Sequence, residues 1–284
     1  MKIGFNMLLW TPFVTEAHYP LFKTLRDTGY DGVEIPLFKG DVKHYGNVGR
    51  ALMDNGLLCT AVTVIPDKAH SPISPDEKER EGARDYLQWA LDCCEALHAE
   101  VLCGPYYQPL GVFTGKGPTE EEKERAAEIH WNMACVAEDA NVLLAIEPLN
   151  RFECYFLNTL HDAAEYVRRV GHPYLKAMYD TFHGNIEEKD PVGCILEEGD
   201  VLGHFHVSAN DRGTPGCDHI PWPETFSALR RSHYDGWITI EAFGRAMPDL
   251  AATTCVWRDL SRSPEEVYEG GYDLISNGWK NALP

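Results

Sequence analysis

The chain has 284 residues, 44% of them hydrophobic and 24% charged, which is enough to bury one large core and suits a single α/β barrel. It carries 25 Lys and Arg against 44 Asp and Glu, and the net charge of 25 − 44 = −19 repels nucleic acid and anionic lipid surfaces. We therefore expect a small neutral substrate, with no nucleic-acid or membrane partner.

Two further features bear on where the chain works. Its N-terminus lacks a basic segment followed by an apolar one, and no apolar run approaches the roughly 18 residues expected of a membrane span. The nine cysteines are an odd number without zinc-type or thioredoxin-type spacing. Together these observations predict reduced thiols in a cytoplasmic protein.

Strand and helix signals alternate through the first half of the chain. Apolar and alternating runs predict strands at residues 2–6, 30–35, 58–65 and 100–105. Helices are expected at residues 15–29, 44–56 and 74–98, and a capping box with Ser74 as its first residue opens the last of them. Residues 104–118 are rich in glycine, proline and aromatic residues, and form either a lid or a structural loop.

The same alternation continues in the second half. Thr119, followed by three glutamates, is expected to begin a helix. Four apolar runs then predict strands that end near Glu147, Asp180, Val207 and Glu241. Further helices are expected near residues 159–170, 191–200, 223–233, 249–260 and 264–282.

Eight strands in strict alternation with at least eight helices require a parallel sheet with right-handed crossovers. We predict a (β/α)8 TIM barrel, with residues 1–284 as one domain that has a C-terminal helical extension. An open doubly wound sheet is the alternative. However, no Gly-x-Gly-x-x-Gly follows the first strand and no Gly-x-x-x-x-Gly-Lys-[Ser/Thr] occurs, so the usual nucleotide cradles are missing.

Side chains at the ends of the last four predicted strands form a candidate metal site. Glu147, Asp180 and Glu241 stand at three of these ends, and the run 203–207 supplies a histidine between the last two. Each residue alone is more often a cap or an ion-pair partner. Four of them on successive strand ends of one barrel meet at the same rim, and three carboxylates with one imidazole suit Mn²⁺, Mg²⁺ or Co²⁺.

Such a site has a chemical purpose. A divalent cation chelated by a hydroxy-ketone stabilises the enediolate formed when a carboxylate removes a proton from carbon. His183 and Arg212 are expected to donate toward the developing oxyanion, and Glu153 to orient a neighbouring hydroxyl. The alternatives are a solvated loop charge for Arg212 and an ion pair with Arg151 for Glu153. For Glu34, on the second strand, a buried salt bridge inside the barrel is favoured over a role in the site.

These motifs resemble one known family. The residues concerned are Asn-Arg-Phe-Glu at 150–153 after Glu147, Asp-Thr-Phe-His at 180–183, His-Phe-His at 204–206, Arg-Gly-Thr-Pro-Gly at 212–216, and Glu241 through Phe243. Together they are similar to the ketose 3-epimerases, the D-tagatose/D-allulose 3-epimerase family among the xylose-isomerase-like sugar isomerase and epimerase barrels. The similarity covers essentially the whole chain in strand order.

The resemblance implies specific roles. Glu147, Asp180, His206 and Glu241 would bind Mn²⁺ or a similar ion, and the two glutamates would also transfer protons on opposite faces of substrate C3. Glu153, His183 and Arg212 would hold the O1–O2 end of a free ketose. Its far end would contact aromatic side chains, namely Phe243, Trp10 and Phe13. The chain departs from the family near the end of strand one, where tyrosine is common, and at Cys217-Asp218.

Several alternatives remain open at this stage. An aldose–ketose isomerase or a hydro-lyase acting on an inosose would use the same barrel and metal. An AP-endonuclease-like nuclease would need more ligands from the earlier strand ends and a basic face, and a non-catalytic sugar-binding protein would show no turnover. We also expect a homodimer or homotetramer, in which apolar residues of the C-terminal helices lie at an interface or in helical packing: Val256, Trp257, Tyr268 and Trp279.

Overall fold

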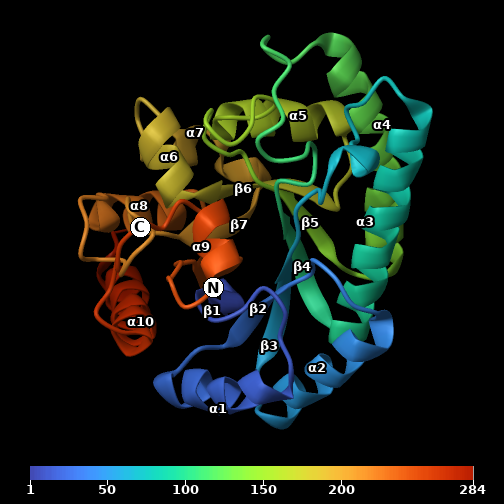
Figure 1. Ribbon diagram of the computed structural model, residues 1–284. Helices are drawn as coiled ribbons and strands as arrows, with labels where there is room; N and C mark the ends of the chain where they lie inside the picture. The colour runs from blue at the N-terminus through green and yellow to red at the C-terminus, as the bar shows by residue number, and fades with distance from the viewer. Residues whose placement is uncertain (284) are drawn as a thin grey trace.

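A computed structural model describes residues 1–283, which form a closed eight-stranded parallel barrel surrounded by helices (Figure 1). Each strand pairs with the next one in the chain, and β1 closes the barrel against β8. The predicted (β/α)8 TIM barrel is therefore confirmed. The strands are β1 Lys2–Asn6, β2 Gly32–Pro36, β3 Leu58–Val62, β4 Ala99–Gly104, β5 Leu143–Ile146, β6 Leu175–Asp180, β7 Leu202–Val207 and β8 Trp237–Ile240.

The outer layer consists of helices that connect consecutive strands or follow the last strand. They are α1 Tyr19–Thr28, α2 Val42–Asp54, α3 Glu77–Leu97, α4 Glu120–Asp139, α5 Leu160–Val170, α6 Thr181–Glu187, α7 Gly193–Glu198, α8 Trp222–Arg231, α9 Pro248–Thr253 and α10 Pro264–Asn281. Helix α10 packs against α8, α1, β8 and β1 and so fills the outer layer after the last strand. The short helix α9 lies in front of the strands in Figure 1.

Hydrophobic side chains fill two regions of the fold. The larger cluster joins the outward faces of the strands to the helices, as where Phe5 of β1 meets Tyr30 edge-on at 5.4 Å. A smaller cluster includes Val62, Cys103 and Met178, which alternate along their strands with the outward-facing residues. Polar and charged side chains that are fully buried, such as Asn6 and Glu34, share this interior. The barrel centre is thus partly apolar and partly ionic.

Local signals placed most helix starts correctly. Thr119 begins α4 as expected, and it does so through a capping box with Glu122. The capping box assigned to Ser74 is wrong, because Asp76 caps α3 by accepting from the backbone N–H of Lys78. Ser74 instead accepts from the N–H of Asp76 through its hydroxyl. Serine and aspartate both cap helices, so the spacing alone did not separate them.

The remaining differences lie after β6 and near the C-terminus. Helix α6 begins directly at Thr181, where the sequence suggested only a strand end, because Asp180 caps it. Helices α7 and α9 are shorter than expected. Of the four residues considered for an interface, Trp257 is 72% exposed, whereas Val256 and Tyr268 are buried and Trp279 packs against the core.

Two expectations about the environment can be compared with the structure. No helix within residues 1–283 is long and apolar enough to cross a membrane. All nine cysteines, each of which lies in that part of the chain, carry free thiols.

The loop expected to be a lid divides into two parts. Tyr106, Tyr107 and Gln108 are buried, and the amide oxygen of Gln108 accepts from the N–H groups of Tyr155 and Phe156. Residues 111–117 are mostly exposed. The first part is therefore a packed structural segment, while a lid role for the exposed tip stays a prediction.

We predict that Gly104→Ala destabilises the protein by at least about 1–3 kcal/mol and weakens the site at Glu147. Gly104 has φ +127°, and a Cβ there would collide with the carbonyl oxygen of Thr63. Its own carbonyl accepts from the N–H of Glu147 at 3.1 Å. Gly111→Ala is the matched control, since Gly111 has φ +71° but open space around it. Equal losses of unfolding free energy in the two variants would contradict the steric argument.

Candidate active site

Four side chains from the ends of β5, β6, β7 and β8 converge inside one rim of the barrel. Glu147 and Glu241 directly follow β5 and β8, Asp180 is the last residue of β6, and His206 is the penultimate residue of β7. One ligand atom from each lies within 4.8 Å of the others, and all four residues are buried. The sequence predicted this group, and the structure brings it together.

His206 presents an open nitrogen to the three carboxylates. Its Nδ1 lies 3.6 Å from Asp180 Oδ2 and 3.6 Å from Glu241 Oε1, and this buried atom has no hydrogen-bond partner. Its Nε2 lies 2.8 Å from Glu34 Oε1. A buried imidazole nitrogen without a hydrogen-bond partner, together with the carboxylate oxygens that it faces, forms a ligand set expected for a divalent cation. These residues therefore fit the predicted metal.

Burial and neighbouring charges change the pKa values of two of these carboxylates. Burial, and then the negative charge of Glu241, raises the pKa of Glu147 well above the usual glutamate range. Burial opposes ionisation of Asp180 as well, but hydrogen bonding and charge from His206 and His183 lower its pKa. Asp180 also accepts from the hydroxyl of Ser208 at 2.7 Å and from the N–H groups that begin α6. The cluster thus holds charge that a cation would neutralise.

A second set of polar side chains lies beside the carboxylates. Arg212 Nη2 is 3.2 Å from Glu153 Oε1 and 3.1 Å from His183 Nε2. His183 Nε2 is in turn 3.9 Å from Glu147 Oε1. The guanidinium of Arg212 lies 4.1 Å from the ring centre of Phe182 and 4.8 Å from that of Phe243. Two aromatic rings therefore hold this cation next to the candidate metal ligands.

His183 and Arg212 can act together on one acceptor. The N–H of Asn150 donates to His183 Nδ1, and burial lowers the pKa of His183 to about 4, so the neutral ring carries its proton on Nε2. That N–H and the N–H of Arg212 Nη2 face each other without an acceptor between them. An oxygen atom with developing negative charge is the group that both can bind.

The structure also decides between the alternatives for the charged residues. Arg151 bonds to Glu187, so Glu153 is not its partner. Arg212 is only 7% exposed and is not a solvated loop charge. Glu34 pairs with His204 and His206 inside the barrel, as the salt-bridge interpretation predicted.

Of the three aromatic residues expected at the far end of the substrate, only Phe243 contacts a residue of the candidate site in the structure. Phe243 is buried against Arg212, beside the site. Trp10 packs 5.0 Å from Phe5, and Phe13 stacks on His44 at 4.4 Å. These contacts do not join Trp10 or Phe13 to the carboxylates, so their role in binding substrate stays a prediction.

Sequence reasoning missed three residues that hold the site. Asn150 binds both His183 and Glu153, Ser208 binds Asp180, and Asn6 donates to Glu241 at 3.2 Å. Each of them stands at or just beyond a strand end, so a search of these positions for polar residues of every type would have found them.

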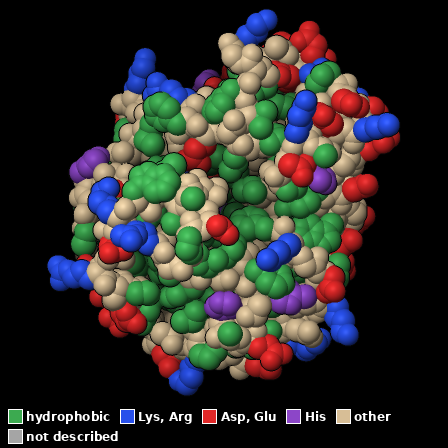
Figure 2. All heavy atoms as spheres, viewed as in Figure 1, with side chains coloured by type: hydrophobic (Ala, Val, Ile, Leu, Met, Phe, Trp, Pro, Cys, Tyr) green, Lys and Arg blue, Asp and Glu red, His purple; other side chains and the backbone are tan. Residues whose placement is uncertain are grey.

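A large groove lies elsewhere on the surface, between α8 and α10, and Trp222, Phe226 and Leu274 contribute to its lining. It contains no group of carboxylates and histidine like that at the strand ends. Figure 2 shows a hollow near the middle of the face seen in Figure 1, with hydrophobic side chains around it. We place the candidate active site at the strand ends because the ligand set and the donors lie there.

Comparison with known proteins agrees with this assignment. The family described as Xylose isomerase-like TIM barrel matches residues 22–273. A probable ketose 3-epimerase of Synechocystis is 32% identical, with 97% of this chain and 96% of that protein covered. A D-psicose 3-epimerase of Ruminiclostridium cellulolyticum is also 32% identical, with 94% and 92% covered.

Solved structures show the same likeness. The structure of D-psicose 3-epimerase with D-tagatose from Clostridium cellulolyticum H10 superimposes with a TM-score of 0.88, at 27% identity and full coverage of both chains. The chain therefore belongs to the xylose isomerase-like TIM barrels and, within them, to the ketose 3-epimerases.

We predict that the increase in melting temperature caused by Mn²⁺ grows as the pH rises above the usual glutamate range. The raised pKa of Glu147 means that the metal-free protein loses stability as pH rises through that pKa, and a bound cation removes the repulsion responsible. Calorimetry of metal-free and Mn²⁺-saturated protein measures the difference. Glu147→Gln should flatten the pH dependence. A gain that does not change with pH in the unsubstituted protein would contradict the electrostatic account.

Proposed function

We propose that this protein epimerises a free ketose at C3 through a cis-enediolate, with Glu147 and Glu241 as the two acid/base groups. One observation carries the proposal: two buried glutamates share a cluster with the open Nδ1 of His206, which supports a pair of proton-transfer groups beside one cation site. Inverting a carbon centre through a planar intermediate requires proton removal on one face and delivery on the other. The similarity to a probable ketose 3-epimerase and to a D-psicose 3-epimerase supports the substrate class.

The cation we propose is Mn²⁺, with Co²⁺ or Mg²⁺ as alternatives. Glu147, Asp180, His206 and Glu241 would hold it, and the three carboxylates with one imidazole suit these ions. When bound, it would act as a Lewis acid that stabilises the enediolate charge by several kcal/mol.

The protein's own residues then divide the remaining work. In our proposal His183 and Arg212 donate to the oxygen at C2, and Glu153, held by Arg212 and Asn150, orients the hydroxyl at C1. Phe243, with Trp10 and Phe13, would contact the far end of the sugar. The neighbouring loop supports this arrangement, since the N–H of Gly111 donates to the carbonyl of Glu153 at 2.8 Å.

The setting of the reaction is also a proposal. Nine free thiols support a cytoplasmic location, and the 72% exposed Trp257 supports a contact between copies in a homodimer or homotetramer. Light scattering of the full chain measures the number of subunits.

We predict that Glu147→Gln and Glu241→Gln each block epimerisation while each still exchanges the C3 hydrogen of one epimer only. A single remaining carboxylate can deprotonate reversibly on its own face, so deuterium from D₂O enters C3 without inversion. NMR of ketohexoses recovered from D₂O measures the label, after Mn²⁺ occupancy has been matched.

Controls for this experiment separate the competing activities. Exhaustively chelated protein should be inactive, and Mn²⁺ or Co²⁺ should restore turnover. Label at C1 with the unsubstituted protein would favour an aldose–ketose isomerase, and loss of water from a cyclic inosose would favour a hydro-lyase. Near-normal epimerisation by either variant would overturn the two-base assignment.

We predict that Arg212→Ala lowers kcat by about 10²-fold and raises KM much less, since its N–H donates mainly to the charge that develops in the transition state. Arg151→Ala is the matched control, because Arg151 pairs with Glu187 and is largely exposed. Steady-state kinetics with saturating Mn²⁺ measures both. Equal effects of the two substitutions on kcat would remove Arg212 from the oxyanion-binding role.

A further inference from the structure

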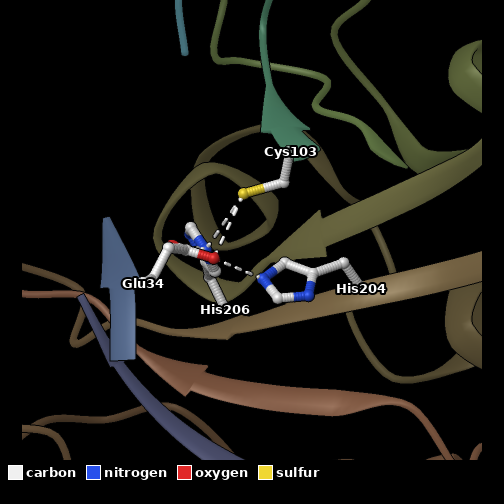
Figure 3. Close-up of side chains that lie close together, drawn as sticks. All are labelled: Glu34, Cys103, His204 and His206. Atoms are coloured by element: carbon white, nitrogen blue, oxygen red, sulfur yellow. Dashed lines mark hydrogen bonds and ion pairs between the residues drawn. The ribbon is translucent and has the colours of Figure 1, made fainter. Parts of the chain in front are cut away.

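A second group of metal-type side chains lies inside the barrel, next to the candidate metal ligands. It consists of Glu34, Cys103, His204 and His206, all of them buried (Figure 3). His206 belongs to both groups, so the second group either holds another ion or serves the first. The hydrogen bonds around Glu34 distinguish these two possibilities.

Both carboxylate oxygens of Glu34 are occupied by protein donors. Oε1 accepts from His206 Nε2 at 2.8 Å and from Asn6 Nδ2 at 2.9 Å. Oε2 accepts from the hydroxyl of Thr60 at 2.9 Å and from the thiol of Cys103 at 3.3 Å, and His204 Nε2 lies 2.9 Å away. A carboxylate has about four lone-pair sites, so these donors leave none for a second ion. The group is thus a hydrogen-bonded network around one anion.

The bond to Glu34 determines what His206 can offer on its other side. A carboxylate oxygen accepts, so His206 Nε2 must carry a proton, and the neutral ring, which is the form that binds a cation, then has its free lone pair on Nδ1. Nδ1 is the atom that lies 3.6 Å from both Asp180 and Glu241 and has no partner of its own. Glu34 therefore selects both the orientation and the tautomer in which His206 can bind a cation.

Asn6 connects the same carboxylate to one of the proposed proton-transfer groups. Its Nδ2 donates to Glu34 Oε1 at 2.9 Å and to Glu241 Oε1 at 3.2 Å. Its Oδ1 accepts from the N–H of Leu8 at 2.8 Å, which fixes the amide so that its nitrogen faces the carboxylates. One asparagine at the end of β1 thus holds two glutamates from β2 and from the end of β8.

We propose that Glu34 and Asn6 are positioning residues for the metal centre, an inference that rests on the proposed function. Glu34 holds the ring of His206 with Nδ1 toward the cation, and Asn6 holds the carboxylate of Glu241 in register with it. In this proposal both residues act through the candidate metal ligands and neither contacts substrate. A carboxylate that accepts from the far nitrogen of a ligating histidine also increases the basicity of the ligating nitrogen, so its loss weakens metal binding.

The test is the affinity of the full-length chain for Mn²⁺, measured by competition with a chelator. Glu34→Gln should weaken Mn²⁺ binding by about 10- to 100-fold. The amide of glutamine has an N–H₂ group, which would face the protein donors that now bind the Glu34 carboxylate. Glu198→Gln is the matched control: Glu198 is buried and pairs with His161 and Arg168, but it lies on α7 in the outer layer. Its Mn²⁺ affinity should equal that of the unsubstituted protein.

The Co²⁺ absorption spectrum gives a readout that a merely structural role would not change. Glu34→Gln should alter this spectrum, since the imidazole ligand is reoriented, and Glu198→Gln should not. If Glu34→Gln fails to fold, Thr60→Val removes one donor to Glu34 with little change of shape and should weaken Mn²⁺ binding a few-fold. Asn6→Ala should lower kcat with less effect on Mn²⁺ affinity than Glu34→Gln.

The possible outcomes distinguish a failure of this inference from a failure of the proposed function. An unsubstituted chain that binds no Mn²⁺ overturns the proposed function and the inference together. Normal Mn²⁺ affinity in Glu34→Gln, or in Thr60→Val where Glu34→Gln does not fold, overturns the inference alone. Elemental analysis should find one ion per chain, in Cys103→Ala as well. A second equivalent that disappears in Cys103→Ala would show that the network is itself a metal site.

Discussion

Mutual repulsion among three buried carboxylates is the constraint on which the rest of the site depends. Glu147, Asp180 and Glu241 lie close together where water does not screen them, and burial disfavours the charged forms of Glu147 and Asp180. Such a group persists only where neighbouring donors or a cation compensate it. The surrounding structure supplies donors to Asp180 and Glu241, and the open nitrogen of His206 completes a set suited to a cation.

The donors that stabilise these anions lie both at the rim of the barrel and deeper in its interior. Ser208 and the first turn of α6 serve Asp180, while Arg212 and Asn150 serve Glu153. Deeper in the interior, burial opposes the ionisation of Glu34, but the charge and hydrogen bonds of His206 and His204 hold its pKa well below the usual range. The interior is therefore organised around anions at two depths, and His206 connects them.

The barrel makes this arrangement possible because its strands are short and converge. Parallel strands place their carboxyl ends at one rim, so residues far apart in the chain become neighbours, as Asn6 and Glu241 do. Positions next to these ends have unusual backbones. Gly104 has φ +127° under the carbonyl of Thr63, and Arg212 has φ 64° between its two aromatic neighbours. Local strain at such positions is balanced by packing and holds functional groups in place.

The sequence by itself determined the strand order and the barrel, because both depend on local periodicity and on position along the chain, and it indicated three of the four candidate metal ligands in the same way. Glu147, Asp180 and Glu241 were visible as polar residues that end apolar runs. Only the tertiary structure decided which partner each polar group takes. Arg151 pairs with Glu187 and not with Glu153, and Asp76 rather than Ser74 caps α3. Such choices depend on distances between elements that no local pattern encodes, and the network of Asn6 and Glu34 around His206 is the clearest case.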